Sequence, residues 1–421
     1  MTVDWAGRYA ERIRRARNNA IEEILKLTQR PEMISFAGGL PAAELFPVER
    51  VLEATQRVLK GPKQHEALQY GVSQGYTPLR EMIAERVRAT GARCTAENVL
   101  VTSGSQQALD LIGKVFINPG DCIAVEEPTY LGMLDAWNVY GATYATVATD
   151  ECGMISTALQ EVLEHHPIKL IYLVPNFQNP TGVTTTLERR VEIVRLARRY
   201  GVPVVEDDPY GMLRYEGDPL APLLAIDAGS ADTPHGGNSR GGGGADLGNV
   251  IQLGTFSKTL CPGLRVAWIV APAEVIQRLA QTKQDGDLHT STFAQAVVYE
   301  TARDGFLEQH VNTLRTVYGK RRTLMLDVME VFFPGRLSWT RPQGGLFVWV
   351  RLPAGADATD LLKEAVGQGV AYVPGSPFYP NGGGANTLRM NFSNADPTRI
   401  EQGIRRLASV FERACEKALA G

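Results

Sequence analysis

A lysine inside an apolar run is the residue of this sequence best suited to chemistry. Lys258 stands between Phe256 and Leu260, and Arg265 follows a few residues later. Burial and a neighbouring cation both lower the pKa of an amine, and only the neutral amine is a nucleophile. We therefore expect Lys258 to condense with an aldehyde. A single lysine of this kind often only extends from a strand end into water, so the interpretation depends on polar residues upstream.

Two other apolar runs also end in polar side chains. Asn179 follows one of them, and Asp207 and Tyr210 follow the next. Ligands bind at the carboxyl ends of strands in a parallel α/β sheet, so these residues and Lys258 are expected to meet there. Pyridoxal phosphate needs such a set: a lysine for its aldehyde, a carboxylate for its ring nitrogen and donors for its ring oxygen. The sequence therefore predicts a pyridoxal-phosphate site.

A phosphate site is predicted in the turn at residues 102–107. Its small residues allow backbone N–H groups to meet a phosphate at the positive end of a helix. The same turn could be a plain helix cap. Because the lysine motif around Lys258 occurs in the same sequence, we favour phosphate binding by Ser105 and Gln106. We expect Ser257 and Arg265 to complete this cradle, with Arg265 forming paired hydrogen bonds.

The elements that must position these residues alternate between short β-branched runs and helical patterns, which indicates a mostly parallel sheet. Strands are predicted at 98–102, 122–126, 169–174 and 202–206, and helices at 8–30, from Ser105 onwards and at 187–200. Strand patterns at 345–352 and 387–392, with flanking helices, indicate a smaller α+β domain at the C-terminus. The predicted fold class is therefore α/β, a large domain with a mostly parallel sheet followed by a small α+β domain.

The predicted domains are an N-terminal helix and arm at 1–50, a large cofactor-binding domain at 51–300, and an interdomain helix with a small domain at 301–421. Within the large domain, residues 228–248 form a glycine-rich insertion. Such a segment cannot bury enough apolar surface to offset its ordering entropy. We expect it to be a flexible surface loop.

Composition excludes several classes of partner. The chain has 421 residues and a net charge of −3, which gives no reason to expect nucleic acid or a membrane as a partner. Its five cysteines are scattered without CxxC spacing, as in a reducing compartment, and no metal site is expected. No apolar run reaches the ~20 residues that a membrane span needs. A soluble, cytoplasmic protein is the expectation.

Four segments carry a resemblance to a known family. They lie at residues 35–41, 68–71, 102–110 and 382–389, and they occur together with the lysine and aspartate motifs in one order and spacing. From about Ile34 to its end, the chain resembles the fold type I pyridoxal-phosphate aminotransferases of the aspartate aminotransferase superfamily (class I/II). Within this superfamily it is most similar to the branch that contains 2-aminoadipate aminotransferases.

The resemblance implies roles around the cofactor. Tyr130 would stack on the face of the ring. Asn179 and Tyr210 would hydrogen-bond the ring oxygen, and Asp207 would bind the ring nitrogen. Tyr70 would reach the phosphate of a neighbouring subunit, so the active unit would be a homodimer.

The resemblance also implies how a substrate is held. Arg389 matches the family's arginine for the α-carboxylate, which a guanidinium grips through two parallel bonds. The backbone amide of Gly39 and the side chain of Asn179 would assist. Lys258 would then act as general base and acid on Cα, in a transamination that pairs an L-amino acid with a 2-oxo acid, most simply 2-oxoglutarate.

The side chain of the donor is less well specified by the sequence. Where 2-aminoadipate enzymes carry an arginine in the N-terminal helix, this chain has Glu22, although Arg14, Arg15 or Arg17 could substitute. Donors that are aromatic or aliphatic therefore stay open. Glu22 facing the pocket would favour a basic or polar donor, and Glu22 facing solvent would have no effect.

Two other functions remain open at this point. One is a different pyridoxal-phosphate reaction on the same fold, such as an oxidase, lyase or decarboxylase, because fold and cofactor do not determine which bond breaks. The other is the sensor half of a GntR-type regulator. Such a regulator needs an N-terminal winged-helix module, and few residues precede Gly39 in this sequence.

Overall fold

The computed structural model describes residues 2–14, 32–229 and 247–420. An eight-stranded sheet forms the centre of its larger part, in the order β2-β9-β8-β7-β6-β3-β4-β5. These strands are β2 (Val99–Thr102), β3 (Cys122–Glu127), β4 (Thr143–Asp150), β5 (Gly153–Met154), β6 (Ile168–Leu173), β7 (Val204–Asp207), β8 (Val250–Thr255) and β9 (Ala267–Val270). Neighbours from β8 through β7, β6 and β3 to β4 pair in parallel, whereas β9 and β5 are antiparallel to their neighbours. The sheet is mostly parallel, as predicted.

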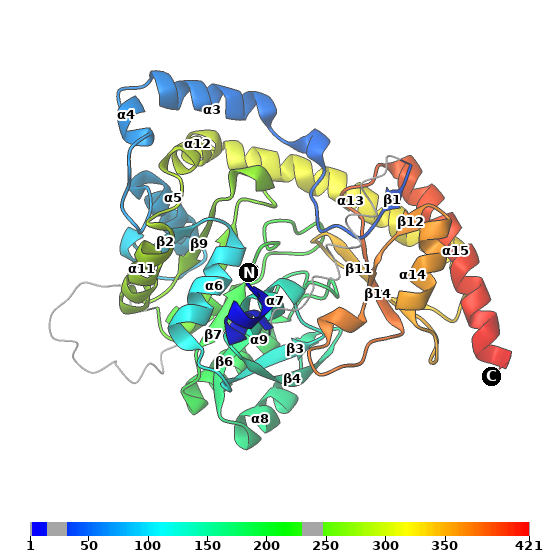
Figure 1. Cartoon of the computed structure of the whole chain (residues 1–421). Coiled ribbons are helices and arrows are strands. Elements are labelled where there is room, and N and C mark those ends of the chain that lie inside the picture. The colour runs from blue at the N-terminus through cyan, green and yellow to red at the C-terminus, as the bar shows by residue number, and fades with distance from the viewer. Residues whose placement is uncertain (1, 15–31, 230–246, 421) are drawn as a thin grey trace.

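Helices cover both faces of this sheet (Figure 1). Leu100 of β2 contributes to one hydrophobic core, and its neighbours Val99 and Val101 contribute to the other. Alternate side chains of a strand point to opposite faces, so the sheet is buried between two apolar layers. Ligands can therefore reach it mainly at the ends of its strands. The helices that pack on the first core are α6 (Ser105–Phe116), α7 (Leu131–Asn138) and α11 (Ala273–Asp287); those on the second are α5 (Thr77–Arg88), α8 (Ser156–His165), α9 (Leu187–Tyr200), α10 (Leu223–Gly229) and α12 (Thr292–Ala302).

A smaller antiparallel sheet follows, in the order β10-β11-β14-β13. Its strands are β10 (Ser338–Trp339), β11 (Phe347–Arg351), β13 (Val373–Pro374) and β14 (Thr387–Asn391), and β1 (Ile34–Ser35) pairs in parallel with β12 (Val370–Ala371). The long helix α13 (Phe306–Phe332) runs from the large part towards this sheet and packs against α15 (Pro397–Ala420), which also contacts α14 (Ala358–Gly367) (Figure 1). The remaining helices of the described residues are α1 (Glu11–Arg14), α3 (Val48–Lys60) and α4 (Gln64–Ala67). Short 3₁₀ turns occur at Ala6–Arg8, Ala43–Leu45, Ala96–Asn98, Pro262–Leu264 and Ser376–Phe378.

The predicted elements are present with small shifts at their ends. Helix α9 begins and ends where the sequence placed it, because Thr186 caps its first turn and Gly201 ends it at φ 65°. The predicted helix at 8–30 is described only over Glu11–Arg14. Glu22, Arg15 and Arg17 and most of the glycine-rich insertion lie outside the described residues.

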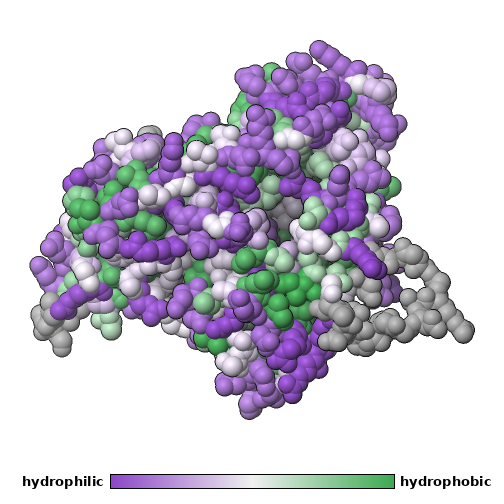
Figure 2. Space-filling view, turned by 180° about the vertical axis from the view of Figure 1, so that it is seen from behind, coloured by the Kyte–Doolittle hydropathy of each residue, from purple (hydrophilic) through white to green (hydrophobic). Residues whose placement is uncertain are grey.

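One face of the molecule is drawn in Figure 2 and is mostly polar. Seen from behind, hydrophilic residues cover most of the face and hydrophobic ones gather in a few areas (Figure 2). No helix within the described residues is long and apolar enough to cross a membrane.

Candidate active site

The predicted lysine lies at the carboxyl end of β8. Its Nζ donates a hydrogen bond of 2.7 Å to the carbonyl oxygen of Gly39, which follows β1. Burial, followed by the charges of Arg389 and Arg265, lowers the pKa of Lys258 to about 8. Both influences that the sequence suggested are therefore present, and Arg389 adds to them. A substantial fraction of this amine is neutral near physiological pH.

Asp207 is the last residue of β7, next to β8 in the sheet. Its side chain is buried, and its Oδ2 accepts a hydrogen bond of 2.8 Å from the Tyr172 hydroxyl. Its Oδ1 has no hydrogen-bond partner among the described residues. Burial raises the pKa of Asp207 to about 7, the Tyr172 bond opposes this, and Asp208 adds to it. A cationic N–H donor at Oδ1 would satisfy this carboxylate and lower its pKa again.

The turn between β2 and α6 has the shape of an anion cradle. Gly104 has φ 89°, and a Cβ at this position would overlap the Arg265 guanidinium. The buried Oγ of Ser105, at the first position of α6, lacks a partner among the residues described. Arg265, itself at φ 52°, is exposed to solvent. A cation, a helix N-terminus and an unpaired hydroxyl thus lie together at this turn. Any residue larger than glycine at position 104 would collide with the cation.

Arg389 lies in the middle of β14 and is 3% exposed. Its Nη1 donates to Asn179 Oδ1 at 2.7 Å, and its Nη2 donates to the carbonyl of Ala37 at 2.8 Å. The guanidinium carbon is 4.3 Å from the ring centre of Phe347 and 5.3 Å from that of Phe378.

These two bonds leave Arg389 short of partners. Its Nε has none within the described part of the chain. Burial lowers the pKa of Arg389 to about 10, while Tyr210 and Tyr130 raise it. A buried guanidinium with free donors is a site for a carboxylate.

Two tyrosines and an asparagine complete the buried cluster. Burial, followed by the charge of Asp207, raises the pKa of Tyr130 to about 12, whereas Arg389 and Arg265 lower it, so this phenol lies in the field of the same groups. Tyr210 is buried, hydrogen-bonds Asn179, and has its pKa raised by burial. Both phenols are therefore neutral hydrogen-bond donors.

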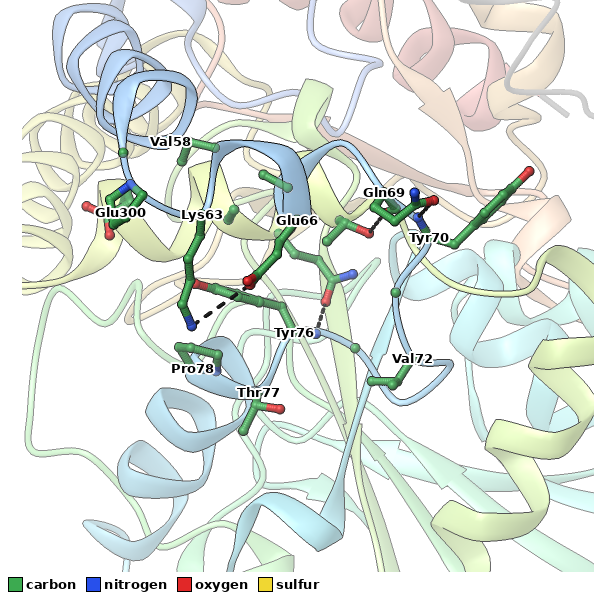
Figure 3. A pocket seen from close by; sticks show the side chains of 18 of the residues that line it. Val58, Lys63, Glu66, Gln69, Tyr70, Val72, Tyr76, Thr77, Pro78 and Glu300 are labelled. Carbon is green, nitrogen blue, oxygen red and sulfur yellow. Dashed lines mark hydrogen bonds and ion pairs between the residues drawn. The ribbon is translucent and has the colours of Figure 1, made fainter.

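Tyr70 lies apart from this cluster. Its side chain is 78% exposed, and its ring meets His289 edge-on at 5.8 Å. The backbone N–H of Tyr70 donates to Gln69 Oε1 at 2.9 Å, and the ring extends away from Lys63, Glu66 and Tyr76 (Figure 3). These residues border a groove of about 550 Å³.

Three predicted residues have contacts that differ from those expected. The carbonyl of Gly39, not only its amide, faces the site, because it accepts the Lys258 hydrogen bond. Gln106 is exposed and donates through Nε2 to the carbonyl of Gly132. Ser257 is buried beside Thr255, with 3.0 Å between their hydroxyl oxygens.

Sequence reasoning missed three contacts of the site: the Tyr172 hydroxyl, the Ala37 carbonyl, and the ring of Phe347. The position of Tyr172, in an apolar run that forms the strand beside β7, was the one available signal. No group of three or more metal-ligating side chains occurs in the described part of the chain.

The site fits pyridoxal phosphate. Among the described residues, Asp207 Oδ1 lacks the N–H donor that a protonated ring nitrogen would supply, and the Gly104 turn brings the Arg265 guanidinium close to the unpaired Ser105 hydroxyl at the N-terminus of α6. The amine of Lys258 lies in the same field as Arg265 and Arg389. Arg389 leaves donors free for a second, carboxylate ligand.

Comparison with known proteins agrees with this geometry. The model of the family "Aminotransferase class I and II" matches residues 31–407. The 2-aminoadipate transaminase of Thermus thermophilus is 43% identical, covering 97% of this chain and 98% of that protein. Aromatic-amino-acid aminotransferase 1 of Thermococcus litoralis is 42% identical, covering 99% and 97%. The solved α-aminoadipate aminotransferase of Thermus thermophilus, complexed with N-(5'-phosphopyridoxyl)-L-leucine, has a TM-score of 0.88 and 39% identity, covering 98% of this chain and 100% of that one.

Proposed function

This chain belongs to the class I and II aminotransferases, and from that premise we propose that its Lys258 site exchanges amino groups between an L-amino acid and 2-oxoglutarate. The protein is a pyridoxal-phosphate-dependent aminotransferase of fold type I. One observation supports the roles of these residues. Arg389 acts on the charge of Lys258, and both Arg389 and Asp207 act on Tyr130. Asp207 and Arg389 each have a buried polar atom without a partner among the described residues.

Residues of the large sheet are proposed to hold the cofactor. Pyridoxal phosphate, when bound, supplies the electron sink that makes the Cα–H bond of an amino acid acidic. Asp207 binds the ring nitrogen and stays ionised there. Asn179 and Tyr210 donate to the ring oxygen, and Tyr130 lies against the ring.

The phosphate is proposed to lie at the N-terminus of α6. Backbone N–H groups at Ser105 and Gln106 and the free Ser105 hydroxyl donate to it, and Ser257 contributes its hydroxyl. Arg265 neutralises its charge. The Gly104 turn makes this approach possible because it carries no Cβ.

Arg389 is proposed to bind the α-carboxylate of the donor. Its bonds to Asn179 and Ala37 hold the guanidinium still, and Phe347 and Phe378 shield it from water. A fixed carboxylate fixes the position of Cα. Lys258, whose pKa lies near 8, would take the proton from Cα as a base and, as an acid, deliver it to C4′ of the cofactor.

A second copy of the chain is proposed to complete the site. Tyr70 is exposed and directed away from its own cluster, which suits contact with the phosphate of a partner. The cysteines of the described residues are all free, which suits a reducing compartment such as the cytoplasm.

The donor class follows less directly. The two relatives above are named for aromatic amino acids and for 2-aminoadipate, and we propose a broad donor range that includes both. Whether Glu22 narrows this range depends on a segment outside the described residues.

A single-turnover screen tests this function. The purified, cofactor-loaded enzyme is mixed with one amino acid at a time, and the visible band of the cofactor is followed together with the 2-oxo acid released. Adding 2-oxoglutarate must then restore the band and yield one equivalent of glutamate. Release of carbon dioxide, ammonia or peroxide in place of glutamate would instead indicate a decarboxylase, lyase or oxidase.

A further inference from the structure

A fully buried lysine lies behind the proposed phosphate turn. Lys283, in the C-terminal half of α11, has no exposed side-chain surface. Its Nζ makes three hydrogen bonds, to Gln107 Oε1 at 2.7 Å and to the two carboxylate oxygens of Asp287 at 2.8 and 2.9 Å. All three donors of this ammonium group are therefore used.

Gln107 connects this lysine to the turn. Its Oε1 also accepts from the backbone N–H of Ser103 at 2.7 Å, and its Nε2 donates to Asp287 Oδ2 at 2.6 Å. Ser103 is the residue before Gly104, where the chain enters the turn. The side chains of Lys283, Asp287 and Gln107 are thus hydrogen-bonded to one another, and the Gln107 oxygen links this group to the turn through the Ser103 N–H.

A contribution to folding stability does not by itself explain why a lysine and a carboxylate are paired at a buried position. Burial lowers the pKa of Lys283 and opposes its charged form, and Asp287 acts against this. A buried ion pair can often be replaced by apolar residues of similar size at little or no loss of stability. An apolar side chain could neither donate to the Gln107 oxygen nor hold the Asp287 carboxylate that accepts from the amide nitrogen. These two contacts together turn the Gln107 oxygen towards Ser103.

We propose that Lys283 is a positioning residue for the cofactor's phosphate, which acts by locking Gln107 against the Ser103 N–H and so fixing the turn at residues 103–106. This inference rests on the proposed assignment of that turn to the phosphate. Without the lysine, the Gln107 oxygen loses one of its two donors, and the Asp287 carboxylate that holds the amide nitrogen loses its cationic partner. The amide is then held less firmly against the Ser103 N–H, and the N–H groups of the turn are less well fixed. The loss falls on phosphate binding and spares the remainder of the cofactor.

The test compares two ligands that differ only in the phosphate. Dissociation constants of the apo-enzyme for pyridoxal and for pyridoxal phosphate are measured by titration, and the constant for pyridoxal divided by that for pyridoxal phosphate gives the contribution of the phosphate. Lys283→Met is expected to reduce this ratio by about ten-fold or more, the usual effect of losing one hydrogen bond to a charged group. Gln107→Met, at a half-buried position where folding is less at risk, is expected to do the same.

Lys114→Met is the matched control. Lys114 pairs with Asp110 four residues earlier at 2.8 Å, on the same helix as Gln107, but these side chains are 41% and 38% exposed and do not contact the turn. Its ratio should equal that of the unaltered enzyme.

The outcomes separate this inference from the site assignment. Arg265→Ala tests the phosphate cradle itself. A ratio reduced by Arg265→Ala but unchanged by both Lys283→Met and Gln107→Met would overturn the role of Lys283 and leave the cradle in place. An equal rise in the dissociation constants for pyridoxal and pyridoxal phosphate would also overturn the role of Lys283, because it would show that the whole cofactor site, and not only the phosphate turn, has been disturbed. A ratio unchanged in all three variants would reject the cradle and the inference together.

Discussion

Replacing Arg389 with lysine keeps the charge and removes the planar fork of donors. Arginine offers five N–H donors, and the structure commits two of them, to Asn179 and Ala37, which leaves three for a substrate carboxylate. Lysine offers three in total. After the same two bonds it has one left, so the paired grip on the carboxylate becomes a single bond.

The expected loss follows from that count. One charge-assisted hydrogen bond contributes roughly 1.5–3 kcal/mol, so kcat/KM should fall by about ten- to 150-fold. Cofactor affinity should not change, because Arg389 is assigned no cofactor contact. The assay is steady-state kinetics with a good donor, beside a titration of the apo-enzyme with cofactor.

A substrate without the carboxylate provides the sharper comparison. The penalty of Arg389→Lys should disappear when the donor is the corresponding amino acid amide in a single-turnover measurement. Arg351→Lys, on the neighbouring strand β11 and exposed, is the matched control and should behave like the unaltered enzyme. An unchanged kcat/KM, or an equal loss with acid and amide, would refute the assignment of Arg389 to the carboxylate.

Four further predictions concern the cofactor. Lys258→Ala should abolish measurable turnover while the phosphate contacts still retain the cofactor, as absorbance after gel filtration will show; near-normal turnover would contradict the assignment. Asp207→Asn should lower kcat by roughly two to three orders of magnitude, because one partner of a buried charge pair is lost, and a small change would exclude Asp207 as the partner of the ring nitrogen. Only the neutral amine attacks an aldehyde, and the pKa of Lys258 is lowered to about 8, so the rate of cofactor uptake by apo-enzyme should rise with pH about a midpoint near 8; a midpoint near the ordinary value of 10.5 would show that burial does not act as described. Gly104→Ala should weaken cofactor binding by about ten-fold through contact with Arg265, whereas Gly120→Ala, at a similar φ but with nothing near the added Cβ, should not.

Local patterns were enough to predict most elements and several site residues. The parallel strands, the bounds of α9 and the polar strand ends that carry Asp207 and Lys258 depend on short stretches of sequence, and the structure has them where they were expected. The position of β9 was not predicted. It is inserted antiparallel between β2 and β8, and a short apolar run does not reveal its direction.

Contacts between distant segments were beyond sequence reasoning. The bond from Tyr172 to Asp207 depends on the pairing of β6 with β7, and the bond from Arg389 to Ala37 joins residues 352 positions apart. Residue type gives no signal for a backbone carbonyl as partner. Such contacts need the assembled fold before they can be seen.

The two hydrogen bonds of Arg389 also bear on the order in which the parts of the site are made during synthesis of the chain. Their partners lie 210 and 352 positions earlier in the sequence. A ribosome synthesises a chain from its N-terminus, and domains generally fold as units while the chain emerges. All proposed cofactor ligands of the chain's own lie at or before Arg265, whereas the arginine of β14 emerges near the end. The cofactor ligands proposed within the chain are therefore all synthesised before β14, which carries the arginine proposed to hold the carboxylate of the amino acid.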